Sequence, residues 1–188
     1  MNKLFSKKPR VENSFYRIRF VKEKDLNDLL EIYSNDENLK FVNNDDCNGD
    51  SLYCDNLELL KEKYQFWKYA YKKNWFIKLS IIDKKNNKVI GLIELLKRER
   101  YDSFNNALII KLDCLLEYES KEILKSIFNL LERGILKDIS YTKIAIKASS
   151  YMFERKETLI ELGFKLSNRI LIGLEDNKAY KDYYVRKK

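Results

Sequence analysis

The stretch Leu115–Ser126 reads LLEYESKEILKS and joins two segments of opposite character. Before it, residues 107–114 (ALIIKLDC) form a continuous apolar run of the β type, and after it apolar residues recur every three or four positions. A turn from a strand into a helix often binds phosphate, because the first amides of the helix have no partner inside it. This turn has no glycine and carries Glu117, Glu119 and Glu122. It fits either a ligand site or an ordinary acidic helix start.

Periodicity on both sides of this turn predicts alternating strands and helices. Strands are expected at 15–21, 75–83, 89–101, 105–116, 142–149, 164–174 and 179–187, with a hairpin turn at 84–88. Helices are expected at 22–37, 56–74, 120–137 and 153–163, the last ending at Gly163. The order of strands and helices along the chain is therefore β-α-α-β-β-β-α-β-α-β-β.

This order predicts an α/β (α+β) fold with a mixed, mostly antiparallel sheet and helices on both faces. The strands at 105–116 and 142–149 are separated by a helix, which allows them to pair in parallel. A chain of 188 residues forms one domain of ordinary size. We expect a flexible basic arm at 1–13, followed by a single domain at 14–188.

The net charge of +8 lies mostly at the two ends of the chain. Residues 1–13 carry +3 and the last three residues another +3, which leaves about +2 for the body. That is too little for a basic binding face, so no nucleic-acid partner is expected. Binding of nucleic acid through the two tails is a third, weaker hypothesis.

No apolar run approaches the roughly 18 residues of a membrane helix. The three cysteines, Cys47, Cys54 and Cys114, are an odd number, and although Cys47 and Cys54 could pair, a reduced cytoplasmic protein is favoured. The chain has no histidine, which excludes Ser-His-Asp and Cys-His catalysis and His-assisted zinc sites. No metal site is expected, because residues 44–55 depart from the EF-hand pattern at three positions.

Three motifs in this order resemble the GNAT N-acetyltransferase superfamily. They are RFVKEKDLNDLLEIYSNDE (19–37), KKNNKVIGLIEL (84–95) and ELGF (161–164), and the similarity spans roughly residues 15–186. In that family a Gly-rich turn opens the third helix, and its amides bind the pyrophosphate of acetyl-CoA. The pantetheine pairs with the preceding strand at a splay between two strands. The resemblance implies the same fold and acetyl-CoA as a co-substrate.

The family's turn PEYRGKGIG is similar to LEYESKEIL (116–124), with Tyr118 and Lys121 on matching positions. Here Glu119 replaces the Arg, Ser120 a Gly, and Glu122 and Leu124 the two motif glycines. The cofactor-binding residues that the resemblance implies are Cys114, Leu115, Leu116, Glu119, Ser120, Lys121, Glu122 and Ile123. Backbone amides near Leu115 would polarise the thioester carbonyl.

The resemblance also supplies candidates for proton transfer. Many members carry Asn and Tyr in the fourth helix, but here Met152 and Leu159 stand in those slots. Tyr151 is either a substitute acid or an exposed tyrosine before a helix. Glu94 interrupts an apolar strand and is the candidate base, with a pKa that burial would raise. Alternatively, Glu94 lies on the solvent-facing side of an edge strand.

The segment 36–58 carries a net charge of −6. It is either an acidic rim that attracts an amine acceptor or a solvated mobile loop. The leading hypothesis is an N-acetyltransferase that moves acetyl from acetyl-CoA to a primary amine of a small molecule or peptide. The alternative is a non-catalytic GNAT-like domain that has lost CoA binding and serves as a binding or dimerisation module, with a homodimer as one partner.

Overall fold

The structure, a computed structural model, describes residues 5, 6 and 8–188. An eight-stranded sheet with the order β1-β2-β3-β4-β5-β6-β10-β7 forms its centre, and β8 and β9 make a separate pair. The strands are β1 (Arg10–Glu12), β2 (Tyr16–Phe20), β3 (Ile77–Asp83), β4 (Lys88–Lys97), β5 (Ala107–Cys114), β6 (Lys143–Lys147), β7 (Lys165–Leu166), β8 (Leu171–Ile172), β9 (Ala179–Tyr180) and β10 (Tyr183–Lys187).

Neighbouring strands pair antiparallel except β5 and β6, which are parallel. The pairing of these two strands runs from Ala107 opposite Lys143 to Ile110 opposite Ile146. Parallel strands need a crossover, and here the helix between them provides it. The predicted mixed, mostly antiparallel sheet is therefore confirmed.

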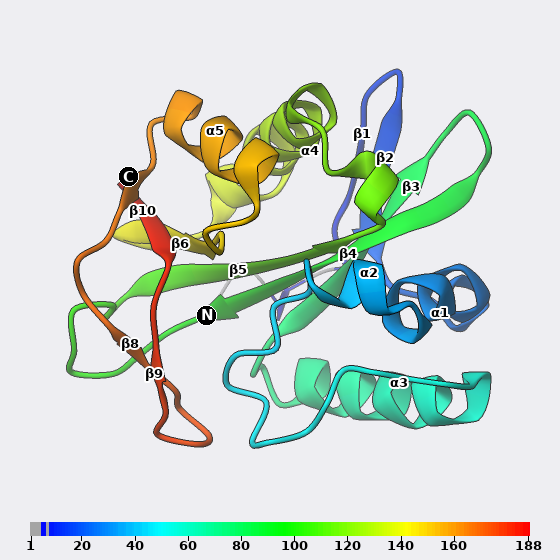
Figure 1. The fold of residues 1–188 in the computed structure, drawn as a ribbon, viewed down its shortest axis with the longest axis horizontal. Coiled ribbons are helices and arrows are strands. Elements are labelled where there is room, and N and C mark those ends of the chain that lie inside the picture. The colour runs from blue at the N-terminus through cyan, green and yellow to red at the C-terminus, as the bar shows by residue number, and fades with distance from the viewer. Residues whose placement is uncertain (1–4, 7) are drawn as a thin grey trace.

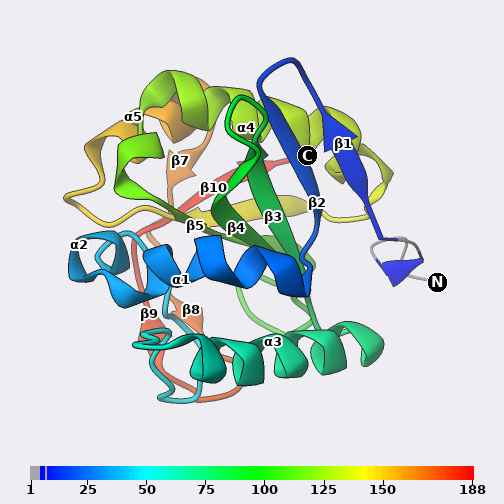
Figure 2. The ribbon, with the colours of Figure 1, turned by 90° about the vertical axis from the view of Figure 1, so that its right-hand side faces the viewer.

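Helices cover both faces of the sheet. They are α1 (Leu26–Ser34), α2 (Asp36–Leu39), α3 (Leu57–Lys72), α4 (Lys121–Gly134) and α5 (Phe153–Glu161). Figure 1 shows α4 and α5 above the sheet and α1, α2 and α3 below it, and Figure 2 shows the same two layers from the side. This confirms the predicted layering.

The helices lie where their apolar residues can be buried. In α1, Leu26, Leu29, Ile32 and Tyr33 are all at most 1% exposed. Their spacing of three and four places them on one side of the helix, toward the sheet. Burying one such side chain contributes roughly 1.5–3 kcal/mol, so this face holds α1 in place.

Two turns match their expected chemistry. The β3–β4 hairpin turns at 84–87, where Asn87 has a positive φ of 53°. Helix α5 ends at Glu161, and Gly163, just past the C-cap residue Leu162, has a φ of 84° in the left-handed region that glycine adopts most easily. The Gly163 amide donates to the Ile160 carbonyl at 2.9 Å, as expected at a helix end.

Two predictions near the chain ends need correction. Residues 10–12, expected within a flexible arm, pair with β2, from Arg10 opposite Arg19 to Glu12 opposite Arg17. The rest of the expected arm includes residues 1–4 and 7, which lie outside the described residues. The long strands expected at 164–174 and 179–187 are broken into β7, β8, β9 and β10.

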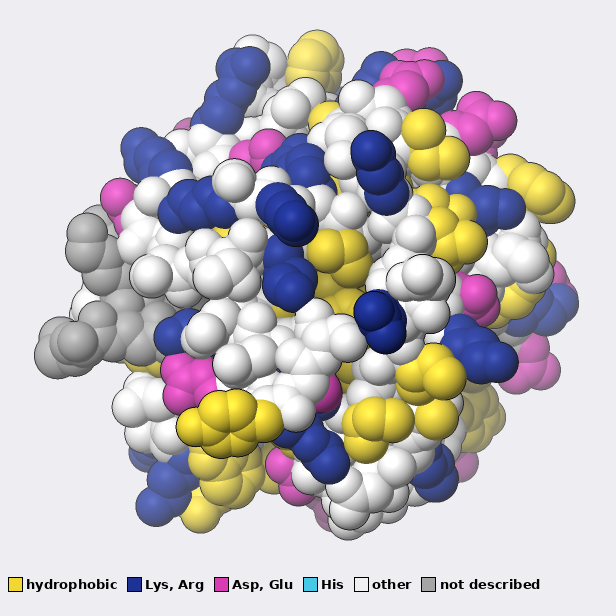
Figure 3. Space-filling view, turned by 90° about the vertical axis from the view of Figure 1, so that its left-hand side faces the viewer, with side chains coloured by type: hydrophobic (Ala, Val, Ile, Leu, Met, Phe, Trp, Pro, Cys, Tyr) yellow, Lys and Arg dark blue, Asp and Glu magenta, His cyan; other side chains and the backbone are white. Residues whose placement is uncertain are grey.

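The face with α5, β10 and the β8–β9 pair mixes basic and apolar side chains. Figure 3 shows Lys and Arg side chains there interspersed with hydrophobic ones. Exposed apolar residues on this part of the chain include Leu166, 58% exposed, and Ile170, 44% exposed. Across the described chain, none of the helices has the length and apolar character needed to cross a membrane.

Candidate functional site

The parallel strands β5 and β6 separate after Ile110 and Ile146, the last residues that pair. Strand β5 continues to Cys114, whereas β6 ends at Lys147. The second half of β5 therefore lacks a strand partner on this side, although it still pairs with β4 on the other. This is the opening in which the family resemblance places the pantetheine of acetyl-CoA.

The side chain of Arg155, from α5, lies at this opening. Its Nη1 donates to the Leu112 carbonyl oxygen of β5 at 3.0 Å. Its Nε donates to Glu119 Oε2 at 3.1 Å, and its Nη2 to Glu119 Oε1. Arg155 is 1% exposed and Glu119 6% exposed, so the pair is buried. The opening along β5 is thus occupied by the chain's own side chains.

Glu119 stands where the family's turn has an arginine, and Arg155 supplies the opposite charge from another helix. Burial disfavours the charged guanidinium, but the negative charge of Glu119 outweighs it and raises the pKa of Arg155. Arg155 is therefore held in its charged form. In a buried pair of this kind the hydrogen-bonding groups are already used by the partner side chain, so few remain to bind a ligand.

A second carboxylate occupies the beginning of α4. The Lys121 amide, one of the first in the helix, has no acceptor inside the helix and donates to Glu154 Oε2 at 3.0 Å. Ser120 is the N-cap residue, as one interpretation of the sequence held, but its side chain makes no capping hydrogen bond. The Lys121 ammonium forms ion pairs with Glu161 and with Glu157. An anion at this helix start would meet glutamates already in place.

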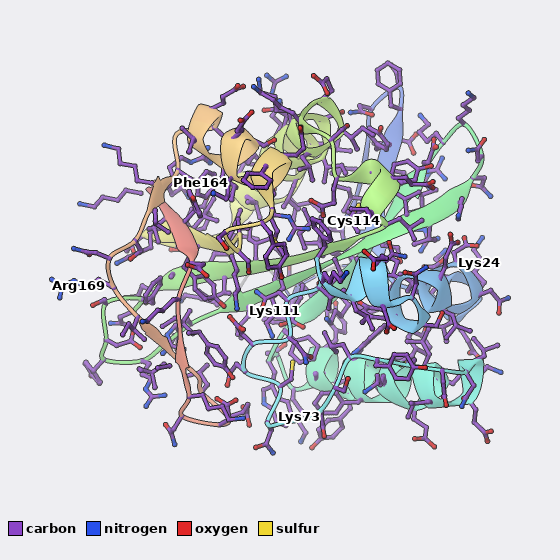
Figure 4. All side chains as sticks on the ribbon, in the orientation of Figure 1. Lys24, Lys73, Lys111, Cys114, Phe164 and Arg169 are labelled. Atoms are coloured by element: carbon purple, nitrogen blue, oxygen red, sulfur yellow. The ribbon has the colours of Figure 1, made fainter. Side chains whose placement is uncertain are left out.

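The remaining predicted cofactor residues are scattered around this turn. The Leu115 amide donates to the Ile90 carbonyl and the Leu116 amide to Asn38 Oδ1, so neither is free to polarise a thioester. Glu122 is exposed and Ile123 half-buried. Cys114, which Figure 4 labels at the end of β5, is fully buried, and burial raises the pKa of its thiol.

Glu94 lies in a buried row of charges on the face covered by α3. Strand register places Lys78, Glu94 and Lys111 side by side on β3, β4 and β5. Glu94 contacts Lys78 Nζ at 2.7 Å and Lys111 Nζ at 3.4 Å. Lys111, at the β5 end of this row, is labelled in Figure 4. The interpretation of Glu94 as a solvent-facing residue of an edge strand is wrong, because it is 7% exposed and β4 is an inner strand.

The expected direction of the Glu94 pKa is also wrong. Burial alone would raise it, but the charges of Lys111 and Lys78 lower the pKa to about 2. The same interaction raises the pKa of Lys111 against the effect of its burial. Glu94 is thus a charged partner of two lysines at neutral pH, which makes it a weak proton acceptor.

Tyr151 lies apart from this row. It is 49% exposed, its hydroxyl donates to the Lys40 carbonyl at 2.6 Å, and its ring packs edge-on against Phe41. It therefore fastens the segment before α5 to the end of α2. Among the described contacts, those of Tyr151 and those of Glu94 share no residue, so the structure does not join the two predicted catalytic groups.

The acidic segment 36–58 is anchored at Asp45 and Asp46, while its other acidic side chains are exposed. Asp45 is 6% exposed, pairs with Lys147 at 2.6 Å and accepts a hydrogen bond from the Tyr183 hydroxyl at 3.1 Å. Asp46 accepts from the amides of Leu174 and Glu175, both at 2.8 Å. Part of the negative charge expected to attract an amine is thus used inside the chain.

No group of three or more His, Cys, Asp or Glu side chains among the described residues could hold a metal ion. Cys47, Cys54 and Cys114 are free thiols.

Sequence reasoning missed Arg155 and Glu154. A signal for Arg155 was present: it lies four residues before Leu159, so it falls on the buried side of the helix. A charge on an apolar helix face needs a partner, and Glu119 is a charge where the family has the opposite one. Nothing in the sequence pattern indicated that Glu154 would reach the start of another helix.

Comparison with known proteins supports the fold. No protein-family model and no curated protein matches the sequence. Among solved structures, a ribosomal-protein-S5-alanine acetyltransferase from Vibrio fischeri is 17% identical, with a TM-score of 0.64, and the match covers 95% of each chain. Spermidine N-acetyltransferase from Vibrio cholerae, solved with CoA and spermine, is 18% identical with a TM-score of 0.61, covering 92% of this chain and 94% of that one.

Mycobacterium smegmatis RimJ, solved in complex with CoA-disulfide, gives a TM-score of 0.67 at 12% identity, covering 95% of this chain and 84% of that one. These neighbours are acetyltransferases of the GNAT class, and the match extends over nearly the whole chain. The protein therefore has the GNAT fold. At such low sequence identity, the similarity shows that the fold is shared and does not show that the activity is shared.

Proposed function

We propose that this protein is a non-catalytic GNAT-fold module in which the chain's own side chains occupy the acetyl-CoA site. The observation that carries the proposal is the buried pair of Arg155 and Glu119 at the opening between β5 and β6. Arg155 also takes the Leu112 carbonyl, one of the β5 backbone groups that a pantetheine would have to use.

A cofactor in this opening would have to displace interactions that the chain already makes. Separating a buried ion pair without replacing it costs about 3–5 kcal/mol. The pyrophosphate would also have to remove Glu154 from the Lys121 amide, or lie beside its carboxylate. Two like charges 4 Å apart repel by about 1 kcal/mol even in water. Acetyl-CoA therefore has to overcome two internal interactions before it gains any of its own.

The groups proposed for proton transfer support the same conclusion. Glu94, with its pKa near 2, is neutralised by two lysines. Leu159, in the slot of the family's tyrosine, is fully buried and apolar. Tyr151 uses its hydroxyl to hold Lys40. None of these side chains is placed to take a proton from an amine or give one to a departing thiolate.

Calorimetric titration with acetyl-CoA tests this proposal. We expect no binding at millimolar ligand for the wild-type chain, nor for Glu122→Gly, because restoring one glycine leaves Arg155 and Glu154 in place. Saturable micromolar binding by the wild type, displaced by CoA, would overturn the proposal. Thermal unfolding with and without acetyl-CoA gives a second readout, since a ligand of the folded state raises its melting temperature.

The second candidate is an N-acetyltransferase that transfers acetyl from acetyl-CoA to a primary amine. Two observations favour it: β5 leaves β6 after Ile110, and α4 begins at the right place to receive a pyrophosphate. In this case Arg155 would turn from Glu119 to the phosphates. Glu119→Gln should then tighten acetyl-CoA binding, and a panel of polyamines, aminosugars and peptides should reveal an acceptor. Homodimer formation stays a prediction that light scattering can test.

A further inference from the structure

A cavity of about 390 Å³ is lined by residues between 8 and 72, none of which belongs to the β5–β6 opening. It is bounded by the segment before β1, the end of β2 and one side of α3, and its lining residues are Lys8, Pro9, Arg10, Arg19, Phe20, Val21, Lys22, Tyr64, Lys68, Tyr71 and Lys72. Figure 2 views the molecule from the side on which β1, β2 and α3 lie. The volume is within the range of roughly 300–1,000 Å³ found for small-molecule sites.

The floor of this cavity is aromatic. Tyr64 and Tyr71 are seven residues apart on α3, so they lie on one face of the helix. The Phe20 ring packs edge-on against Tyr71 with centroids 4.8 Å apart. Phe20 and Tyr64 are each 8% exposed and hold the floor in place, while the half-buried Tyr71 offers the more accessible ring. Such a floor suits a flat apolar group.

The rim of the cavity is basic. Six of its lining residues are Lys or Arg, and no described lining residue is acidic. Arg19 is neutralised by Asp25 at 2.7 Å, and Arg10 contacts Glu12 at 3.3 Å. The four lysines, Lys8, Lys22, Lys68 and Lys72, form no ion pair with any residue that the structure describes.

Two of these lysines lie over the aromatic floor. Lys8 Nζ is 4.6 Å from the centroid of Phe20, and Lys68 Nζ is 5.0 Å from that of Tyr64. Their ammonium groups therefore lie next to the aromatic rings, and neither forms an ion pair with a described carboxylate. A ligand that fits must combine a flat apolar part with an anionic part at short range.

We propose that this cavity binds a mononucleotide, with the base on the Phe20–Tyr64–Tyr71 floor and the phosphate among the four unpaired lysines. Ammonium groups bind phosphate as point charges, and aromatic rings stack on any base. An inorganic anion would leave the aromatic floor unused, and a neutral ring would leave the charges unpaired. The inference is independent of the proposal on the acetyl-CoA site, with which the cavity shares no residue.

Titration of the full chain with AMP, adenosine and inorganic phosphate tests this assignment. We expect AMP to bind, and adenosine and phosphate each to bind at least about tenfold more weakly, because each lacks half of the contacts. Binding should weaken as salt is added. Absence of AMP binding at millimolar ligand would overturn the proposal, and so would phosphate binding as tight as that of AMP. Tighter binding of a single-stranded oligonucleotide would instead indicate a nucleic-acid surface and also overturn it.

Charge reversal locates the site. Lys68→Glu with Lys72→Glu should weaken AMP binding at least about tenfold, since both groups belong to the rim. The matched control, Lys85→Glu with Lys137→Glu, changes the net charge equally at exposed positions outside the cavity and should leave affinity within about twofold. Equal losses in the two variants would overturn the assignment. Circular dichroism checks that both variants fold.

The same variants separate this site from the β5–β6 opening if acetyl-CoA binds, because CoA also carries an adenine nucleotide. Binding that Lys68→Glu with Lys72→Glu abolishes belongs to the cavity. Acetyl-CoA binding that these substitutions leave unchanged takes place outside the cavity. Such binding would contradict the proposed loss of the cofactor site and would leave the mononucleotide proposal untouched.

Discussion

Arg155 of α5 and Glu119 of the turn before α4 form a buried ion pair, joined by two hydrogen bonds, beside the free half of β5. Arg155 also donates a hydrogen bond to the Leu112 carbonyl oxygen of β5. It ties two helices to the strand at the point where β5 and β6 separate. The pair thus has a structural role that does not depend on any cofactor.

Breaking this pair should destabilise the protein strongly. Arg155→Leu leaves the Glu119 carboxylate buried without a partner, which typically costs about 3–5 kcal/mol. The double variant Arg155→Leu with Glu119→Leu removes both charges and should recover most of that loss. Urea unfolding of the three proteins measures the difference. A single variant within about 1 kcal/mol of the wild type would show that the pair is not buried in solution.

Removing the Glu154 carboxylate should weaken the start of α4 modestly. Glu154→Ala frees the Lys121 amide and removes a negative charge from the helix N-terminus, an effect of about 0.5–1 kcal/mol. Glu157→Ala is the matched control, because Glu157 is an exposed glutamate on the same helix and contacts only the Lys121 side chain, at 3.9 Å. Equal destabilisation by the two changes in urea would contradict the role of Glu154 at this amide.

Glu94 should make the protein sensitive to acid. Its pKa falls from 4.5 to about 2 on folding, so the unfolded chain binds the proton more readily. The contribution, on the order of 3 kcal/mol, is fully present above about pH 5 and is lost as the pH falls toward 2. Unfolding free energies measured from pH 7 to pH 2 check this. Glu94→Gln should be less stable at pH 7 and lose less on acidification, and an unchanged pH profile would refute the assignment.

The three thiols should react at different rates. Cys54 and Cys114 are fully buried, and Cys47 is only half-buried. Burial raises the pKa of all three thiols, that of Cys114 well above its ordinary value, and Cys47 is the most accessible of them. A thiol reagent should modify Cys47 first in the native protein and the other two only on unfolding. Mass spectrometry of timed samples identifies the site, and Cys47→Ser should abolish the early phase.

The element order was predictable because each element carries its own local signal. The 3.6-residue spacing of α1 and α4, the asparagine turn of the β3–β4 hairpin and Gly163 depend on neighbours in sequence. The parallel pair of β5 and β6 followed from the intervening helix. The predictions for strands β7 to β10 were less accurate, because such short strands carry too few residues to show a pattern.

The candidate site was predictable in position but not in content. The turn at 115–124 lies where the resemblance placed it, yet the charge of Arg155 and the reach of Glu154 arise from α5, some thirty residues away. The Glu94 pKa was mistaken because its sign depends on Lys78 and Lys111, one on each neighbouring strand. Burial raises the pKa of a carboxylate and ion pairing lowers it. Which effect prevails for Glu94 depends on the strand register, which places a lysine on each side of it.

The sequence by itself determined the layers of this protein and the place of its strand-to-helix turn, since backbone preference and apolar spacing are local properties. It also determined that no histidine chemistry is available. Tertiary structure alone decided where the charges act. It brought Lys8 of the N-terminal segment beside Lys68 and Lys72 of α3, where they form one basic rim. Counting charge along the chain missed this rim, because it assigned Lys8 to the arm and the other two lysines to the body. It also placed Arg155 against Glu119, because electrostatic partners are chosen by distance in space and not by separation in sequence.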